Sequence, residues 1–155
     1  MSWITPKHSV GRPAPLQGAM RRALQILVVL CGISAIFISL LHIVFGPAVI
    51  PGSIPVNATM DSEDRFYATL LTAYGVALLW CARGIAQKSM FVYFLAAVFL
   101  VGGLARIVSI VAVGLPHPFF IAMLAVELGL PVIVAFLQFQ VIDKGSKPSD
   151  EYCNL

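Results

Sequence analysis

Long apolar stretches alternate with short polar ones along the chain, and this pattern predicts the architecture. The apolar stretches cover residues 23–45, 66–82, 90–114 and 119–142. A hydrocarbon core about 30 Å thick needs about 20 apolar helical residues to cross it. A spanning segment must also satisfy its backbone hydrogen bonds internally, which a helix does. We therefore expect an all-α, polytopic membrane protein, an antiparallel bundle of four transmembrane helices.

Proline, glycine and acidic residues mark the segments between and beside these stretches. Residues 1–20 are rich in proline and glycine and predict an irregular cytoplasmic tail; residues 143–155 predict a second one, which leaves 21–142 as the membrane domain. The acidic run at 61–64 predicts the start of the second helix, with Asp61 or Ser62 as its cap. The last two helices are joined by four residues only, so they are antiparallel neighbours.

Composition excludes other classes of protein. The 155 residues are 59% hydrophobic and 11% charged, whereas soluble proteins carry about 25% charged residues. A soluble domain of this size has too much surface to hide so many apolar side chains, and a disordered chain is less hydrophobic. The net charge of +3 is too small to indicate nucleic acid as a partner. The cysteines are far apart and form no disulfide or zinc pattern, and we expect no metal and no cofactor.

The basic residues predict the orientation in the membrane. Eight of the ten Lys and Arg residues fall on one side of the four predicted spans. Arg65 lies on the other side, and Arg106 lies within a span. Because cytoplasmic loops are enriched in Lys and Arg, both termini should face the cytoplasm. We expect a multi-pass protein of a bacterial inner membrane, with the lipid bilayer as its first partner.

Two opposite charges inside the predicted spans suggest an ion pair. An ionised side chain near the bilayer centre costs about 2.5–3.5 kcal/mol on insertion scales, so it usually has a partner or a function. Arg106 and Glu127 each lie eight residues from the short connection between the last two helices. That spacing places both about 12 Å below the outer face. We therefore expect Arg106 and Glu127 to meet.

Other polar side chains fall in the same outer half of the predicted bundle. They are His42, Arg65, Tyr67 and Tyr74. If these residues face inward with the charged pair, they form an outward-facing polar pocket that is closed toward the cytoplasm. Alternatives stand beside this interpretation. In these alternatives the charged pair only holds two helices together, and Tyr74 donates a hydrogen bond to the pair. His42 and Tyr67 are interfacial residues.

Proline and small residues give local predictions about helix packing. Pro131 lacks a backbone donor for the carbonyl of Glu127, so the fourth helix should bend there. The free carbonyl is then available to Arg106 or Tyr74. Small residues at Gly102 and Gly103, and at 68, 72 and 75, should allow close helix approach.

The order of these motifs resembles a known family. The segments are Arg65-Phe66-Tyr67-Ala68-Thr69, Ala73-Tyr74-Gly75, Gly102-Gly103-Leu104-Ala105-Arg106, Gly114-Leu115-Pro116-His117-Pro118 and Glu127-Leu128. Over roughly residues 24–139 the chain is similar to the small four-helix bacterial membrane proteins called domain of unknown function 4345. The resemblance implies a four-span membrane protein and implies no activity. It also implies that the family's recurring polar positions are Arg65, Tyr67, Tyr74, Gly75, Arg106 and Glu127.

Three functional hypotheses follow. The first is a non-enzymatic bundle whose outer pocket binds a small amphipathic ligand or a partner membrane protein. The second is a small proton-coupled transporter, or a transporter subunit, that uses Glu127 and acts as a homodimer. The third is a membrane enzyme that acts on lipid or quinone. The third has the least support, because the sequence contains no nucleophile–base pair, metal set or phosphate-binding loop and identifies no catalytic residue.

Overall fold

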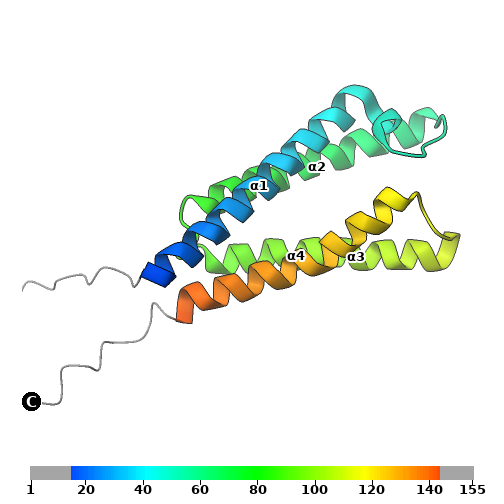
Figure 1. Cartoon of the computed structure of the whole chain (residues 1–155). Helices are drawn as coiled ribbons and strands as arrows, with labels where there is room; N and C mark the ends of the chain where they lie inside the picture. Colours follow the sequence, from blue (N-terminus) through cyan, green and yellow to red (C-terminus); the bar gives the residue numbers. More distant parts are fainter. Residues whose placement is uncertain (1–14, 144–155) are drawn as a thin grey trace, which may run out of the picture.

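The computed structural model describes residues 15–143 and contains two helical hairpins (Figure 1). Its elements are α1 (Pro15–Phe45), the short 3-10 helix η1 (Gly46–Val49), α2 (Ala58–Ala82), α3 (Ser89–Val113) and α4 (Pro118–Asp143). Each of the four α-helices is long and apolar enough to cross a membrane. The all-α fold with four spans, and the antiparallel pairing of the last two helices, are confirmed.

Helix α2 begins earlier than the apolar pattern predicts. Its first residue is Ala58, because the side chain of Asn57 accepts a hydrogen bond from the backbone N–H of Met60 at 3.0 Å and so caps the helix. The acidic run therefore lies inside the helix, and the prediction that Asp61 or Ser62 caps it is wrong. A cap residue can begin a helix well before its apolar stretch begins.

The first and last helices extend slightly beyond the predicted bounds of the membrane domain, 21–142. Helix α1 begins at Pro15, where the fixed φ of proline suits a first helical turn, so residues 15–20 are helical. Helix α4 ends at Asp143. The rest of both predicted tails, 1–14 and 144–155, lies outside the described residues.

Glycines allow the helices of each hairpin to pack closely. A Cβ atom on Gly75 of α2 would lie 2.8 Å from the carbonyl oxygen of Gly32 in α1 and 2.7 Å from Cγ1 of Ile36. A Cβ atom on Gly103 of α3 would lie 3.1 Å from Cβ of Glu127 in α4, whereas Gly102 faces open space. The predicted role of small residues is thus confirmed for Gly75 and Gly103.

The core of the molecule lies where the two hairpins meet, near the connection between α2 and α3. Leu24, Val28, Cys81, Ile85 and Val92 are buried there. Two glutamines join the elements at this end. Gln25 of α1 donates to the carbonyl of Ala82 at 3.0 Å, and Gln138 of α4 donates to that of Ile85 at 2.9 Å. Many large apolar side chains elsewhere point outward, as expected of helices surrounded by lipid.

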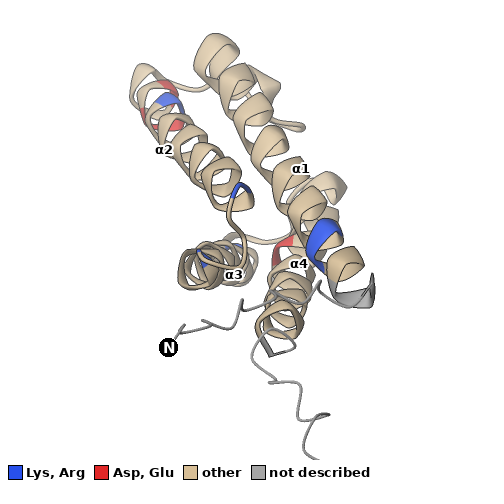
Figure 2. Ribbon diagram, turned by 90° about the vertical axis from the view of Figure 1, so that its left-hand side faces the viewer, with Lys and Arg blue, Asp and Glu red and all other residues tan. Residues whose placement is uncertain are grey.

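Charged side chains are sparse along the helices. In Figure 2 most of each ribbon is tan, the colour of uncharged residues, and acidic and basic residues gather at one end of α2. Helix α4 changes direction partway along its length in Figure 1, and Pro131 is the proline inside it. This change of direction agrees with the predicted bend.

Candidate ligand-binding cavity

A cavity of about 400 Å³ lies between the hairpins, with walls from all four helices. Its size falls within the range of about 300–1,000 Å³ that is usual for small-molecule sites. Most of the wall is apolar; it includes Ala35 of α1, Leu71 of α2, Ala96 and Phe99 of α3, and Leu130 of α4. The lining residues that carry a formal charge are Arg106 and Glu127.

The predicted ion pair between Arg106 and Glu127 is confirmed. Nε of Arg106 donates to both carboxylate oxygens of Glu127, at 2.8 Å to Oε1 and 2.6 Å to Oε2. Gly103, one turn before Arg106, brings the two helices close enough for this contact. The ring of Phe120 lies beside the guanidinium group, with its centroid 5.2 Å from Cζ, which adds a cation–π attraction.

The two members of the pair differ in exposure. The Glu127 side chain is 8% exposed, while that of Arg106 is 38% exposed. A guanidinium group carries five N–H donors, and here only the one on Nε has a partner among the described residues. The terminal nitrogens of Arg106 therefore remain available to a further acceptor.

Tyr74 lies in the cavity wall, but its hydroxyl donates to the backbone of α3 and not to the ion pair. Its hydroxyl donates to the carbonyl of Leu95 in α3 at 2.9 Å, and its ring stacks on Phe99 with centroids 6.3 Å apart. The hypothesis that Tyr74 donates to the pair is therefore wrong. The Glu127 carbonyl likewise accepts from neither Arg106 nor Tyr74 in the described part of the chain: Tyr74 donates to Leu95, and Arg106 donates through Nε to the Glu127 carboxylate.

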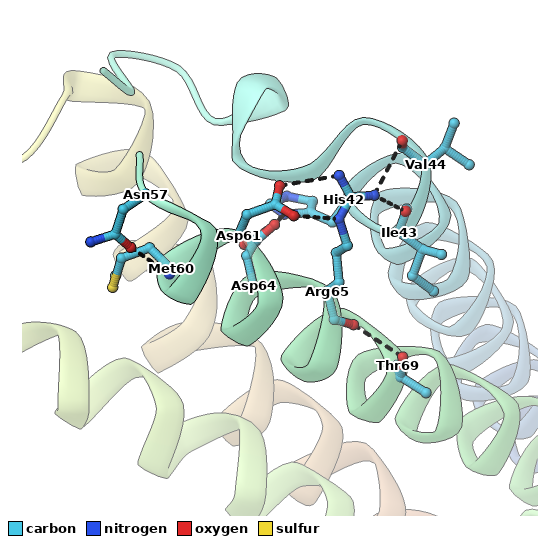
Figure 3. Close-up of polar contacts among 9 residues, drawn as sticks. All are labelled: His42, Ile43, Val44, Asn57, Met60, Asp61, Asp64, Arg65 and Thr69. Atoms are coloured by element: carbon cyan, nitrogen blue, oxygen red, sulfur yellow. Dashed lines mark hydrogen bonds and ion pairs between the residues drawn. The ribbon is translucent and has the colours of Figure 1, made fainter. Parts of the chain in front are cut away.

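His42 and Arg65 belong to a separate cluster near the C-terminal end of α1, which Figure 3 shows. Nδ1 of His42 lies 3.0 Å from a carboxylate oxygen of Asp64, and Nε of Arg65 lies 2.8 Å from one of Asp61. Arg65 also donates to the carbonyl oxygens of Ile43 and Val44. Arg65 thus satisfies carbonyl groups at the C-terminal end of α1, which need partners outside the helix.

Gly46 makes room for this outer cluster. Its φ of +62° is readily adopted by glycine, and a Cβ atom there would lie 2.5 Å from Oδ1 of Asp61. Tyr67, one turn beyond Asp64, is exposed and packs edge-on against Phe66 with ring centroids 5.7 Å apart. That position fits the alternative interpretation of Tyr67 as an interfacial aromatic residue.

The structure thus divides the predicted site in two. Arg106, Glu127 and Tyr74 line the cavity, whereas His42, Arg65 and Tyr67 do not. The prediction of one shared polar pocket is therefore wrong. Depth along the helices placed these residues at similar levels in the bundle. His42 and Arg65, however, pair with carboxylates of α2 and do not reach the space between the hairpins.

Sequence reasoning missed most of the cavity wall. An apolar residue of a transmembrane helix looks the same in sequence whether it faces lipid, a neighbouring helix or a cavity. The sequence analysis also missed the hydrogen bond of 2.7 Å between the Ser39 and Thr72 hydroxyls, which joins α1 to α2. A serine and a threonine inside two adjacent spans were the available signal.

The four spans define a multi-pass helical membrane protein, built as two hairpins with a partly open cavity between them. The chain belongs to the family described as Domain of unknown function (DUF4345), whose sequence profile matches residues 23–138. The family resemblance is thereby confirmed. No curated protein and no solved structure matches the chain significantly.

Proposed function

We propose that this bundle binds a small amphipathic ligand within the bilayer. The observation that carries the proposal is the cavity of about 400 Å³, which has a mostly apolar wall and one ion pair in it. Apolar pockets with a few well-placed polar groups are the usual form of small-molecule sites. The ligand's hydrocarbon part contacts the apolar wall, and its polar part contacts Arg106.

The cavity is partly open at the sides of the bundle, which supports entry from the lipid. Several lining residues are well exposed, namely Leu30, Ile38 and Val126. A molecule dissolved in the membrane therefore reaches the cavity without crossing a polar surface. This route favours a lipid-soluble ligand over a water-soluble one.

In this proposal Glu127 positions Arg106. Both of its carboxylate oxygens accept from Nε of Arg106, and the side chain is nearly buried. A proton carried by Glu127 would weaken this contact and leave the arginine uncompensated in an apolar surrounding. The ion-pair geometry thus supports a binding role for the site more than proton-coupled transport.

We also propose that both termini face the cytoplasm of a bacterium, with the protein in its inner membrane. Arg83 and Lys88 lie between α2 and α3, at the same end of the bundle as Arg21 and Arg22 of α1. At the opposite end, Arg65 is balanced by Asp61. This asymmetry supports the orientation, because cytoplasmic connections carry most Lys and Arg.

Native mass spectrometry after extraction into a mild non-ionic detergent tests the binding proposal. The wild-type chain should carry a lipid-soluble molecule at close to one per chain. The Arg106→Met, Glu127→Leu double variant keeps the pair's neutrality and loses its donors. It should retain about tenfold less, because a hydrogen bond to a charged group contributes about that factor to affinity. A wild-type protein that emerges without any bound molecule, and takes none up, would contradict the proposal.

A further inference from the structure

We infer that the cavity selects an uncharged amphiphile whose oxygen accepts hydrogen bonds, such as a fatty ester, a long-chain ketone or a quinone. The inference rests on the proposed function and names the chemical class of its ligand. It excludes fatty acid anions and phosphate headgroups as the preferred occupants.

The first argument is that a single nitrogen of Arg106 serves both carboxylate oxygens of Glu127. Arginine and carboxylate often pair through two nitrogens and two oxygens. Here Nε alone serves both oxygens of Glu127, at 2.8 and 2.6 Å. The outer edge of the guanidinium, with its terminal N–H groups, is thus left without a partner among the described residues while Arg106 is 38% exposed. These donors suit a ligand that brings an acceptor.

The second argument is the net charge of the site. Arg106 and Glu127 cancel, and no other lining residue carries a formal charge. An anion bound to Arg106 would therefore leave one uncompensated negative charge in an apolar, low-dielectric surrounding, which is costly. It would also lie close to the Glu127 carboxylate. A neutral carbonyl oxygen gains a charge-assisted hydrogen bond without adding any charge.

The third argument is the state of the Tyr74 hydroxyl, an uncharged polar group in the wall. The Tyr74 hydroxyl has already donated its proton to the carbonyl of Leu95 at 2.9 Å. It therefore offers the cavity lone pairs only. The charged donors that a ligand's oxygen can use come from Arg106.

A matched set of probes separates these possibilities on the wild-type protein. Methyl oleate, oleate and cis-9-octadecene have similar apolar chains, but the first carries a neutral ester, the second an anion and the third no oxygen. Purified protein in non-ionic detergent at pH 9, where oleate is ionised, is offered equal amounts of the three. The retained fraction of each is measured by native mass spectrometry. We expect about tenfold more methyl oleate than either competitor.

The outcomes distinguish this inference from the proposed function. Retention of oleate equal to or above that of methyl oleate would overturn the inference and leave the binding function standing. Retention of octadecene equal to that of methyl oleate would do the same, because Arg106 would then contribute nothing. Retention of none of the three would overturn the proposed function, and the inference with it.

A charge-changing variant supplies a second test. Glu127→Gln keeps an acceptor for Nε but leaves Arg106 with an uncompensated positive charge, so the preference should reverse toward oleate by about tenfold. A folded variant with unchanged preference would overturn the electrostatic argument. If this variant fails to fold, the wild-type competition still decides. The infrared band of a ¹³C-labelled ester carbonyl gives a further readout, since it should move to lower frequency on binding to wild type and not in the Arg106→Met, Glu127→Leu variant.

Discussion

Arg106 and Glu127 show how two residues that are each costly in a membrane become stable together. Glycine at position 103 allows α3 and α4 to approach, the carboxylate is nearly buried, and Phe120 lies against the guanidinium group. Equal distance from a short connection was enough to predict this contact from sequence. What sequence did not predict is the use of one nitrogen only, because that depends on the exact offset of the two helices.

The first prediction concerns the energetic asymmetry of the ion pair. Arg106→Met strands Glu127, which is 8% exposed, so it should destabilise the protein by about 3–5 kcal/mol. Glu127→Leu strands Arg106, which is 38% exposed and more able to find other partners, so its cost should be smaller. The double variant should cost much less than the sum of the two. Unfolding in mixed detergent micelles measures all three.

Additive losses in the two single variants would contradict the contact between the side chains. A larger loss for Glu127→Leu than for Arg106→Met would contradict the assigned difference in burial. Neither result depends on ligand, provided that the protein is first delipidated.

At the level of the helices, sequence predicted the spans better than their ends. The apolar stretches located all four helices, because the bilayer thickness dictates their length. The start of α2 was missed because it depends on a single cap, Asn57, in a polar segment. Which side chains line the cavity was missed because apolar helix faces are equivalent in sequence until their neighbours are known.

The second prediction tests the close contact of α1 and α2. Gly75→Ala introduces a methyl group 2.8 Å from the backbone oxygen of Gly32, so the helices must separate, at a cost of about 1–3 kcal/mol. Gly102→Ala is the matched control. Its Cβ atom meets nothing within 4 Å, and replacing a helical glycine by alanine stabilises by about 0.5–1 kcal/mol. Thermal unfolding compares them; equal effects would contradict this helix packing.

The third prediction concerns the bend in α4. Pro131→Ala restores a backbone donor within α4, so the helix should straighten. Spin labels at positions 119 and 139, both exposed, would report this as a longer distance between the labels. If the distance is unchanged, the neighbouring helices hold the bend and the proline is not its cause.

At the level of the whole molecule, the hairpins meet at one end around a buried core and leave a partly open cavity between them farther along. The four-span architecture was predictable from composition and pattern alone. The separation of the polar residues into two clusters was not. Helix depth is a one-dimensional quantity, whereas His42 and Arg106 differ in the direction in which they face.

The fourth prediction concerns topology. In a background without native cysteines, Ser53→Cys should react with a membrane-impermeant reagent on intact cells, because it lies in the connection proposed to face outward. Gln87→Cys, between α2 and α3, should react only after the cells are opened. Both positions are exposed in the structure, so lack of reaction reports sidedness and not burial. The reverse pattern would contradict the proposed orientation.

Ligand retention in two neighbouring variants of α3 tests the proposed cavity most directly. Ala96 lines the cavity, whereas Ala97 is exposed on the outside of the same helix turn. Native mass spectrometry should show the bound molecule on the wild type and on Ala97→Phe. It should be reduced at least about tenfold on Ala96→Phe, whose ring would occupy the space. Equal retention by the two variants would contradict binding in this cavity.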